Sequence, residues 1–412
     1  LPGEAASVVT TLDGYKMALK GRAGAALGIA AIGSFIAGTF GIIGLTFVAP
    51  PLAEFALKFG PPEYFSMTLV GLLLAVFLSG SSVVKGLITL ALGLLFAAVG
   101  LDPVTGNVRF ALGTTHLQSG FDFVTLAMGI FGLGEIFYNL EETEAAQIVT
   151  TKVGRLWPTL QDWAESKWAI VRGSVLGFII GVLPGGGAVL SSLASYGLEK
   201  RLAKKPEEFG EGAIAGVAGP ESANNAASSS SFIPLMTLGI PANASIAMIY
   251  AALLIQGIQP GPFLIAEHPD VFWGVTASMY IGNAMLLALN LPLVGLWVQL
   301  LRVPFSILGP VVVLFTTVGV FSINNNVNDV FALIFFGVVG YLLKKFKFEV
   351  GPLPMAFVLA PMIENALRQS LLISNGSLAI FVQKPISATL LGIFAVMLLS
   401  QAVKFVRTRS AK

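Results

Sequence analysis

The chain contains no cysteine and very little charge. Charged side chains make up 11% of its 412 residues, against roughly 25% in ordinary globular proteins, whereas hydrophobic residues make up 55%. The absence of cysteine excludes disulfides, thiolate metal sites and cysteine nucleophiles within this chain. The shortage of charge excludes a soluble protein.

Groups that enzymes and ATP-driven pumps require are also scarce. The two histidines, His116 and His268, both lie in polar loop sequence, where solvation explains them. No GxxxxGKS/T motif occurs, so this polypeptide has no Walker-type ATP site. No hydrophobic segment combines a nucleophile with a histidine or paired aspartates, so we do not expect an enzyme. A net charge of +2, with no basic block, gives no reason to expect nucleic acid as a partner.

Long charge-free runs are what the sequence has instead. Each of five runs is long enough to cross a hydrocarbon core of about 30 Å, namely residues 24–53, 64–84, 173–198, 271–301 and 303–328. At roughly 20 residues per crossing, the length allows about ten crossings and leaves no room for a sizeable soluble domain. The sequence therefore predicts an all-α polytopic membrane protein.

Two halves of the chain resemble each other at a separation of about 240 residues, and their loop charges are reversed. Residues 13–22 carry three basic side chains, whereas the matching residues 257–270 carry none. Residues 101–122 hold one Arg, whereas their counterpart holds Lys344, Lys345 and Lys347. By the positive-inside rule the halves then face opposite ways, as in secondary transporters with inverted repeats.

This pattern predicts four sections. Residues 1–138 form the first repeat, 139–172 a cytoplasmic connecting loop, 173–385 the second repeat, and 386–412 a final transmembrane helix with a basic tail. The sidedness of the 199–211 loop stays open, because it mixes basic residues with four carboxylates. If that loop is cytoplasmic, residues 173–198 must enter and leave the membrane on one side.

Two interruptions in charge-free sequence predict broken helices. Proline followed by three glycines interrupts residues 183–187, and a Gly-Ile-Pro-Ala-Asn sequence interrupts residues 239–243. In a bilayer such breaks persist only inside protein or beside a watery cavity. Exposed backbone N–H groups there can bind a carboxylate, although a hinge or a close helix crossing is the alternative.

The polar residues 222–231 lie between these interruptions, in a run of 45 residues without charge. We expect a re-entrant hairpin with an Asn/Ser-rich tip, where amide and hydroxyl oxygens suit Na⁺. The predicted cation ligands are Ser222, Asn224, Asn225 and Ser228. Packing between helices is the simpler explanation for residues 229–231. Glu364 and Arg368, four residues apart, are expected to satisfy each other rather than to bind substrate.

Several motifs resemble the large membrane subunit, TctA type, of the tripartite tricarboxylate transporters. They are LPGEAASVVTTLDGY, GLDPVTGNVRF, GVLPGGG, GPESANNAASSSSFIPLMTLGIP and IQPGP. Family sequences begin upstream of this one, so we expect a missing N-terminal part of the first repeat. The family has Gly after GIP, where this chain has Ala242.

The resemblance implies an elevator-type secondary transporter that imports carboxylates such as citrate and uses no ATP. It further implies a small four-helix membrane subunit (TctB type), an extracytoplasmic solute-binding protein (TctC type) and a bacterial-type inner membrane. Apart from the coupling ion we expect no cofactor; Na⁺ is favoured over H⁺ because Asn and Ser do not titrate near neutral pH. The substrate residues expected are Pro184, Gly185, Gly186, Gly187, Gly239, Pro241, Ala242, Asn243, Pro2, Gly3, Glu4 and Ser7. A passive carboxylate channel or an exporter without ion coupling is the alternative.

The reversed loop charges generate a labelling prediction. Because the chain has no cysteine, single cysteines can be introduced at Lys20 and at Gln259 without background. We expect Lys20→Cys to react with a membrane-impermeant maleimide only from the cytoplasmic side and Gln259→Cys only from outside. Labelling of both from the same side would refute the inverted orientation.

Overall fold

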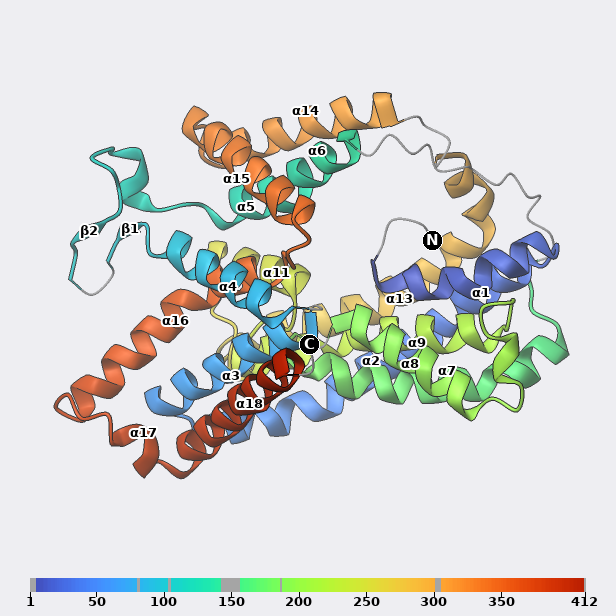
Figure 1. Ribbon diagram of the computed structural model, residues 1–412, viewed down its shortest axis with the longest axis horizontal. Coiled ribbons are helices and arrows are strands. Elements are labelled where there is room, and N and C mark those ends of the chain that lie inside the picture. Colours follow the sequence, from blue (N-terminus) through green and yellow to red (C-terminus); the bar gives the residue numbers. More distant parts are fainter. Residues whose placement is uncertain are drawn as a thin grey trace. The chain divides into compact units, whose positions relative to one another are not determined.

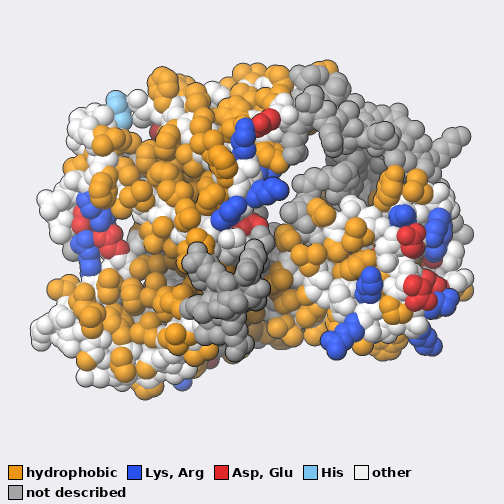
Figure 2. All heavy atoms as spheres, in the orientation of Figure 1, with side chains coloured by type: hydrophobic (Ala, Val, Ile, Leu, Met, Phe, Trp, Pro, Cys, Tyr) orange, Lys and Arg blue, Asp and Glu red, His pale blue; other side chains and the backbone are white. Residues whose placement is uncertain are grey.

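The computed structural model describes residues 5–79, 82–102, 105–141, 156–185, 187–300 and 305–410, which are almost wholly helical (Figure 1). The only strands in these ranges are β1 (Gly100–Leu101) and β2 (Val108–Arg109), an antiparallel pair in which Gly100 lies opposite Arg109. Five helical segments are long and apolar enough to cross a membrane: Ala23–Ala56, Phe123–Glu141, Pro269–Leu293, Ile307–Asn324 and Val327–Lys345. Hydrophobic side chains cover much of the face in Figure 2. The protein is an all-α polytopic membrane protein, as its composition predicts.

The chain forms two compact units. The first comprises Leu1–Glu54, Glu144–Ala242 and Ile258–Ile307; the second comprises Phe55–Thr143, Asn243–Gly257 and Leu308–Lys412. Each unit draws segments from distant parts of the sequence, so the units do not coincide with the sections predicted from the sequence. The repeat boundaries stay a prediction.

The first unit is organised around α7 (Leu160–Val182), α8 (Gly187–Leu202) and α9 (Ala215–Ser230), with α1 (Val8–Leu19) and α2 (Ala23–Ala56) beside them (Figure 1). It also contains η1 (Ala5–Ser7), η4 (Pro206–Glu208), α10 (Phe232–Leu238), α12 (Leu264–Glu267) and α13 (Pro269–Leu300). Hydrophobic clusters join α1, α2, α7 and α9 near one end, and α2, α10, α12 and α13 near the other.

Glycines let α7 lie directly on α9. A Cβ added to Gly177 would stand 2.2 Å from the carbonyl oxygen of Ala223, and one added to Gly181 would stand 2.4 Å from that of Ala227. Residues four apart on α7 thus meet residues four apart on α9 in the same order, so the two helices run parallel. Small residues at this spacing allow the backbone contact that drives helix association in membranes.

Helices α7 and α8 form an antiparallel hairpin. Arg172 of α7 pairs with Glu199 of α8 through two contacts of 2.7 and 2.6 Å. The middle of α7 therefore lies beside the last turns of α8. A proline and glycines close it at residues 183–187, and the break predicted there is confirmed. The two arms therefore begin and end at one end of the first unit.

A buried carboxylate fixes the loop after this hairpin. Asp13 is fully buried, and its Oδ1 accepts the N–H groups of Gly210, Gly212 and Ala213 at 2.9, 2.7 and 2.8 Å. Lys20 also donates to the carbonyl of Glu211 at 2.5 Å. The 199–211 loop, whose sidedness the sequence left open, lies against residues 13–22. The two loops therefore lie together at one end of the first unit.

The second unit packs α4 (Val83–Ala97), α3 (Pro61–Ser79), α18 (Pro385–Ser410) and α16 (Pro352–Ile373) together. Its other layer pairs α15 (Val327–Lys345) with a span made of α5 (Phe123–Ala127), the π-helical turn η3 (Met128–Leu133) and α6 (Gly134–Glu141). Edge-to-face contacts among Phe96, Phe121 and Phe336 join these helices. The remaining elements are η2 (His116–Ser119), α11 (Ala244–Ile255), most of α14 (Phe305–Asn324) and α17 (Ile380–Gln383).

The contact between α7 and α9 predicts opposite effects for two glycines. Gly177→Ala should lower the thermal stability of the purified protein, because its methyl group forces two backbones apart at a cost of about 1 to 3 kcal/mol. Gly197→Ala is the matched control: a Cβ there meets nothing within 4 Å, so stability should hold or rise. Equal melting temperatures for the two variants would contradict the packing described.

Candidate functional site

The first unit contains two backbone interruptions, and each depends on glycine. Helix α7 ends at Val182, and the chain turns through Gly185 at a φ of 79° before α8 begins. Helix α10 ends at Gly239, which has a left-handed φ of 70°. A left-handed backbone is costly for residues with a Cβ, so glycine lets each helix stop abruptly.

The two interruptions touch. The N–H of Gly185 donates to the carbonyl oxygen of Ala242 at 2.7 Å, so each break supplies a partner for a peptide group that the other exposes. The charge-free part of α7, residues 173–182, rises about 15 Å, and that of α8, residues 187–198, about 18 Å. Each is roughly half of a 30 Å hydrocarbon core. The contact therefore lies about half a hydrocarbon thickness from the charged ends of the hairpin.

Six of the twelve predicted substrate residues lie at this contact. Pro184, Gly185 and Gly187 form the first break and are half-buried. Gly239, Pro241 and Ala242 form the second and are buried. Asn243 instead caps α11, accepting the N–H of Ile246 at 3.0 Å on its Oδ1. Gly186, Pro2, Gly3 and Glu4 lie outside the described residues.

A second polar group lies on α9, and its centre is a residue that we did not predict. Glu221 accepts the hydroxyls of Ser7 and Ser34, each at 3.4 Å, on its two carboxylate oxygens. Asn225 donates to Ser34 at 2.8 Å and to Glu221 Oε1 at 3.5 Å. Asn224 donates to Ser7 at 3.5 Å. We call these five residues the Glu221 cluster. Ser7, predicted at the substrate, lies here.

The expected hairpin tip at residues 222–231 is wrong. Asn224 and Asn225 lie within α9, which continues to Ser230, and α10 follows before the left-handed Gly239. Small side chains packed on α7 keep this segment helical. Several serine hydroxyls donate to backbone carbonyls three or four residues earlier. Ser231, for example, is fully buried and donates to the carbonyl of Ser228.

The predicted cation residues separate into two groups. Asn224 and Asn225 belong to the Glu221 cluster. Ser228 is exposed and donates to the carbonyl of Asn224. Ser222 is fully buried beside Gly33 of α2, and within the described part of the chain its hydroxyl has no hydrogen-bond partner. The i, i+4 spacing of Glu221 and Asn225 was the signal in the sequence that could have found the carboxylate. Nothing local pointed to Ser34.

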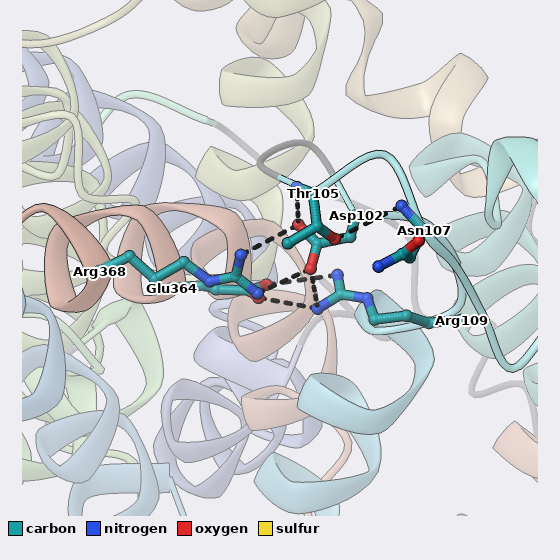
Figure 3. Close-up of polar contacts among 6 residues, drawn as sticks. All are labelled: Asp102, Thr105, Asn107, Arg109, Glu364 and Arg368. Atoms are coloured by element: carbon teal, nitrogen blue, oxygen red, sulfur yellow. Dashed lines mark hydrogen bonds and ion pairs between the residues drawn. The ribbon is translucent and has the colours of Figure 1, made fainter.

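A larger charged network lies in the second unit (Figure 3). Arg109 of β2 contacts Glu364 of α16 at 2.7 Å, and Arg368 contacts Asp102 at 2.7 Å and Glu364 at 2.5 Å. The expected pairing of Glu364 with Arg368 is confirmed. Two positive and two negative groups compensate each other, so this network anchors the β1–β2 turn to α16 rather than offering net charge to a ligand.

Apolar spans together with two helix breaks that contact each other are typical of membrane transport proteins. The chain belongs to the tripartite tricarboxylate transporter TctA family, whose model matches residues 1–354. It is 51% identical, over 95% of its length and 78% of the relative's, to an uncharacterized 52.8 kDa protein in the TAR-I ttuC' 3' region of Agrobacterium vitis. It is 52% identical, over 57% of its length, to a protein in the TAR-II ttuC' 3' region of the same organism, covering 96% of that relative. No solved structure matches.

The network predicts strong coupling between Arg109 and Glu364. Arg109→Ala and Glu364→Ala should each lower the melting temperature, because each leaves an opposite charge short of a partner. The double variant should lose less than the sum of the two, by about 0.5 to 3 kcal/mol. Strict additivity in thermal unfolding of the four proteins would mean that the two side chains do not interact.

Proposed function

We propose that the chain is the membrane-embedded permease subunit of a binding-protein-dependent secondary transporter that imports tricarboxylates or related carboxylates, such as citrate. The observation that carries this proposal is the contact between Gly185 and Ala242, which joins two helix breaks. The family assignment supplies the transport role, and the breaks suggest where the transported molecule is held.

A carboxylate can be recognised at this contact without a cationic side chain. Helix α8 begins beside the contact at Gly187, and the N–H groups of its first turn together with the positive end of its dipole favour an anion. Ala242 and Pro241 are buried there, so the second break offers backbone rather than side-chain groups. Such a site suits a multiply charged substrate that must also be released.

The driving force in this proposal is a cation gradient, with Na⁺ as the ion. Asn224 and Asn225 belong to a polar cluster on the helix that leads to the second break, where their amide nitrogens donate to Ser7 and Ser34. An amide or hydroxyl oxygen cannot carry a proton at neutral pH, whereas it is a good ligand for a hard cation.

The assembly in this proposal is tripartite. A small membrane subunit of the TctB type and an extracytoplasmic binding protein of the TctC type would complete the system in a bacterial inner membrane. The binding protein would capture the carboxylate and the breaks would accept it. This arrangement fits a permease whose own substrate site is mostly backbone and therefore weakly selective.

Reconstituted uptake tests the proposal. Proteoliposomes containing this chain and the small subunit, with the binding protein added outside, should accumulate labelled citrate or a related carboxylate only when an inward Na⁺ gradient is present. Equilibration without accumulation, independent of any gradient, would instead indicate a passive channel.

Gly185→Ala should reduce this uptake at least tenfold. Its φ of 79° strains any residue with a Cβ by about 1 to 2 kcal/mol, which displaces the N–H from Ala242. Gly197→Ala, on the same hairpin but facing open space, is the control and should transport normally. Normal uptake by Gly185→Ala would remove the breaks from the substrate site.

A further inference from the structure

We infer that the loop between α4 and α5, residues 98–121, lies in the lipid interface, the layer of head groups and upper acyl chains at one surface of the bilayer. Four large apolar side chains of this loop, which we call the loop apolar face, make the contact: Leu101, Val108, Phe110 and Leu112. Their exposed fractions range from 47% to 85%. The partner is the bilayer itself, so the inference goes beyond the proposed carboxylate transport and does not depend on it.

The two strands of the loop place its charged and apolar side chains on opposite faces. Leu101 lies directly opposite Val108 in the ladder, so the two side chains share a face. Successive residues of a strand point to opposite faces, so Asp102, which follows Leu101, and Arg109, which follows Val108, point to the other one. There both join the ion-pair network on α16 (Figure 3). The loop is therefore amphipathic, with its apolar face opposite to the face that contacts α16.

The network also keeps charge away from the loop apolar face. Asp102 and Arg109 are the only Asp, Glu, Lys or Arg side chains in residues 98–121. Asp102 is buried and contacts Arg368 at 2.7 Å, while Arg109 contacts Glu364 at 2.7 Å. Both charges of the loop are thus neutralised on α16. An exposed apolar face without charge is complementary to the interfacial layer of a bilayer.

The backbone of the loop also suits a place with little water. The N–H groups of Asp102, Gly106, Thr114 and Gly120 donate to carbonyl oxygens within the loop at 2.8 to 3.2 Å. The two ends of the loop meet, since a Cβ added to Gly100 would stand 2.7 Å from the nitrogen of Gly120. Unpaired peptide groups are costly away from water, and this closed loop pairs many of its own.

Two residues of the loop apolar face have a strained backbone. Phe110 has a φ of 52° and Leu112 a φ of 49°, both in the left-handed region. Bulky residues are rare there and persist where their surroundings hold them. Both side chains are exposed, so packing inside the protein does not hold them. Lipid around the two side chains would offset the strain, because it removes their apolar surface from water.

The loop apolar face continues a surface that already faces lipid. The loop follows α4, on which Ile88 and Leu95 are exposed, and it ends where the apolar span Phe123–Glu141 begins. In a membrane protein the exposed apolar sides of such helices face lipid. No charged residue lies between Leu95 and Leu101, so the apolar surface runs from the helix into the loop. This continuity selects the bilayer, rather than a soluble protein or a second copy of the chain, as what covers the face.

Spin labels on single cysteines measure the depth of the loop. Three variants replace exposed leucines in a chain without cysteine: Leu112→Cys in the loop, Leu160→Cys at the start of α7 and Leu314→Cys in the apolar span of α14. Leu160 is the matched control, because it is as exposed as Leu112 but lies about 20 Å along α7 before its charge-free part.

Each labelled protein is placed, one copy per disc, in nanodiscs of phosphatidylcholine and phosphatidylglycerol. Relaxation of the label by oxygen, which partitions into lipid, is compared with relaxation by a nickel chelate, which stays in water. The oxygen-to-nickel collision ratio of Leu112→Cys should exceed that of Leu160→Cys by about threefold or more and approach that of Leu314→Cys.

A ratio for Leu112→Cys equal to that of Leu160→Cys overturns the inference. So does a ratio that rises only after a soluble binding protein is added, which would assign the face to that protein. A ratio that rises only in discs holding two copies would assign the face to a second chain and also overturns it. If labelled Leu112→Cys melts below the unlabelled protein, Phe110→Cys takes its place and is judged by the same comparison.

Discussion

A peptide group that leaves a helix inside a bilayer must find a partner within the protein, and the first unit is built around that requirement. Each of its two helix breaks exposes backbone groups, and an unpaired group away from water costs several kcal/mol. The bond from Gly185 to Ala242 lets the breaks satisfy part of this need for each other.

This contact depends on how closely the helices approach. Gly173, Gly177 and Gly181 lie along one face of α7 and leave room for the backbone of α9. The resulting parallel register carries the ends of both helices to the same depth. At the opposite end, the Asp13 carboxylate ties the loop before α9 to α1, so the register is fixed at its base as well. The α7 glycines thus position the contact between the two helix breaks without taking part in it.

The sequence predicts the breaks well because their cause is local. Proline and glycine interrupt a helix whatever surrounds them, and the structure has breaks after Val182 and Leu238. The prediction of a tip at residues 222–231 failed for a related reason. Asn and Ser discourage a helix only when their side chains compete with its backbone. In α9 Ser228 donates back to the carbonyl of Asn224 within the helix, and the segment is held by packing on α7.

The two charged groups were only partly predictable, because their members are far apart in the chain. Glu364 and Arg368 lie one helical turn apart, so their pairing could be expected from spacing alone. Arg109 lies 255 residues from Glu364, and the sequence around neither residue predicts their contact. The Glu221 cluster is similar, since Ser34 and Glu221 are 187 residues apart. Only packing could join them.

The Glu221 cluster holds α9 from a second side. Ser7 of η1 and Ser34 of α2 hydrogen-bond to Glu221, and Asn225 donates to Ser34. The same chain continues from α9 through α10 to Gly239 and Ala242. The helix that leads to the second break is therefore fixed both by polar contacts with η1 and α2 and by the glycine contacts with α7.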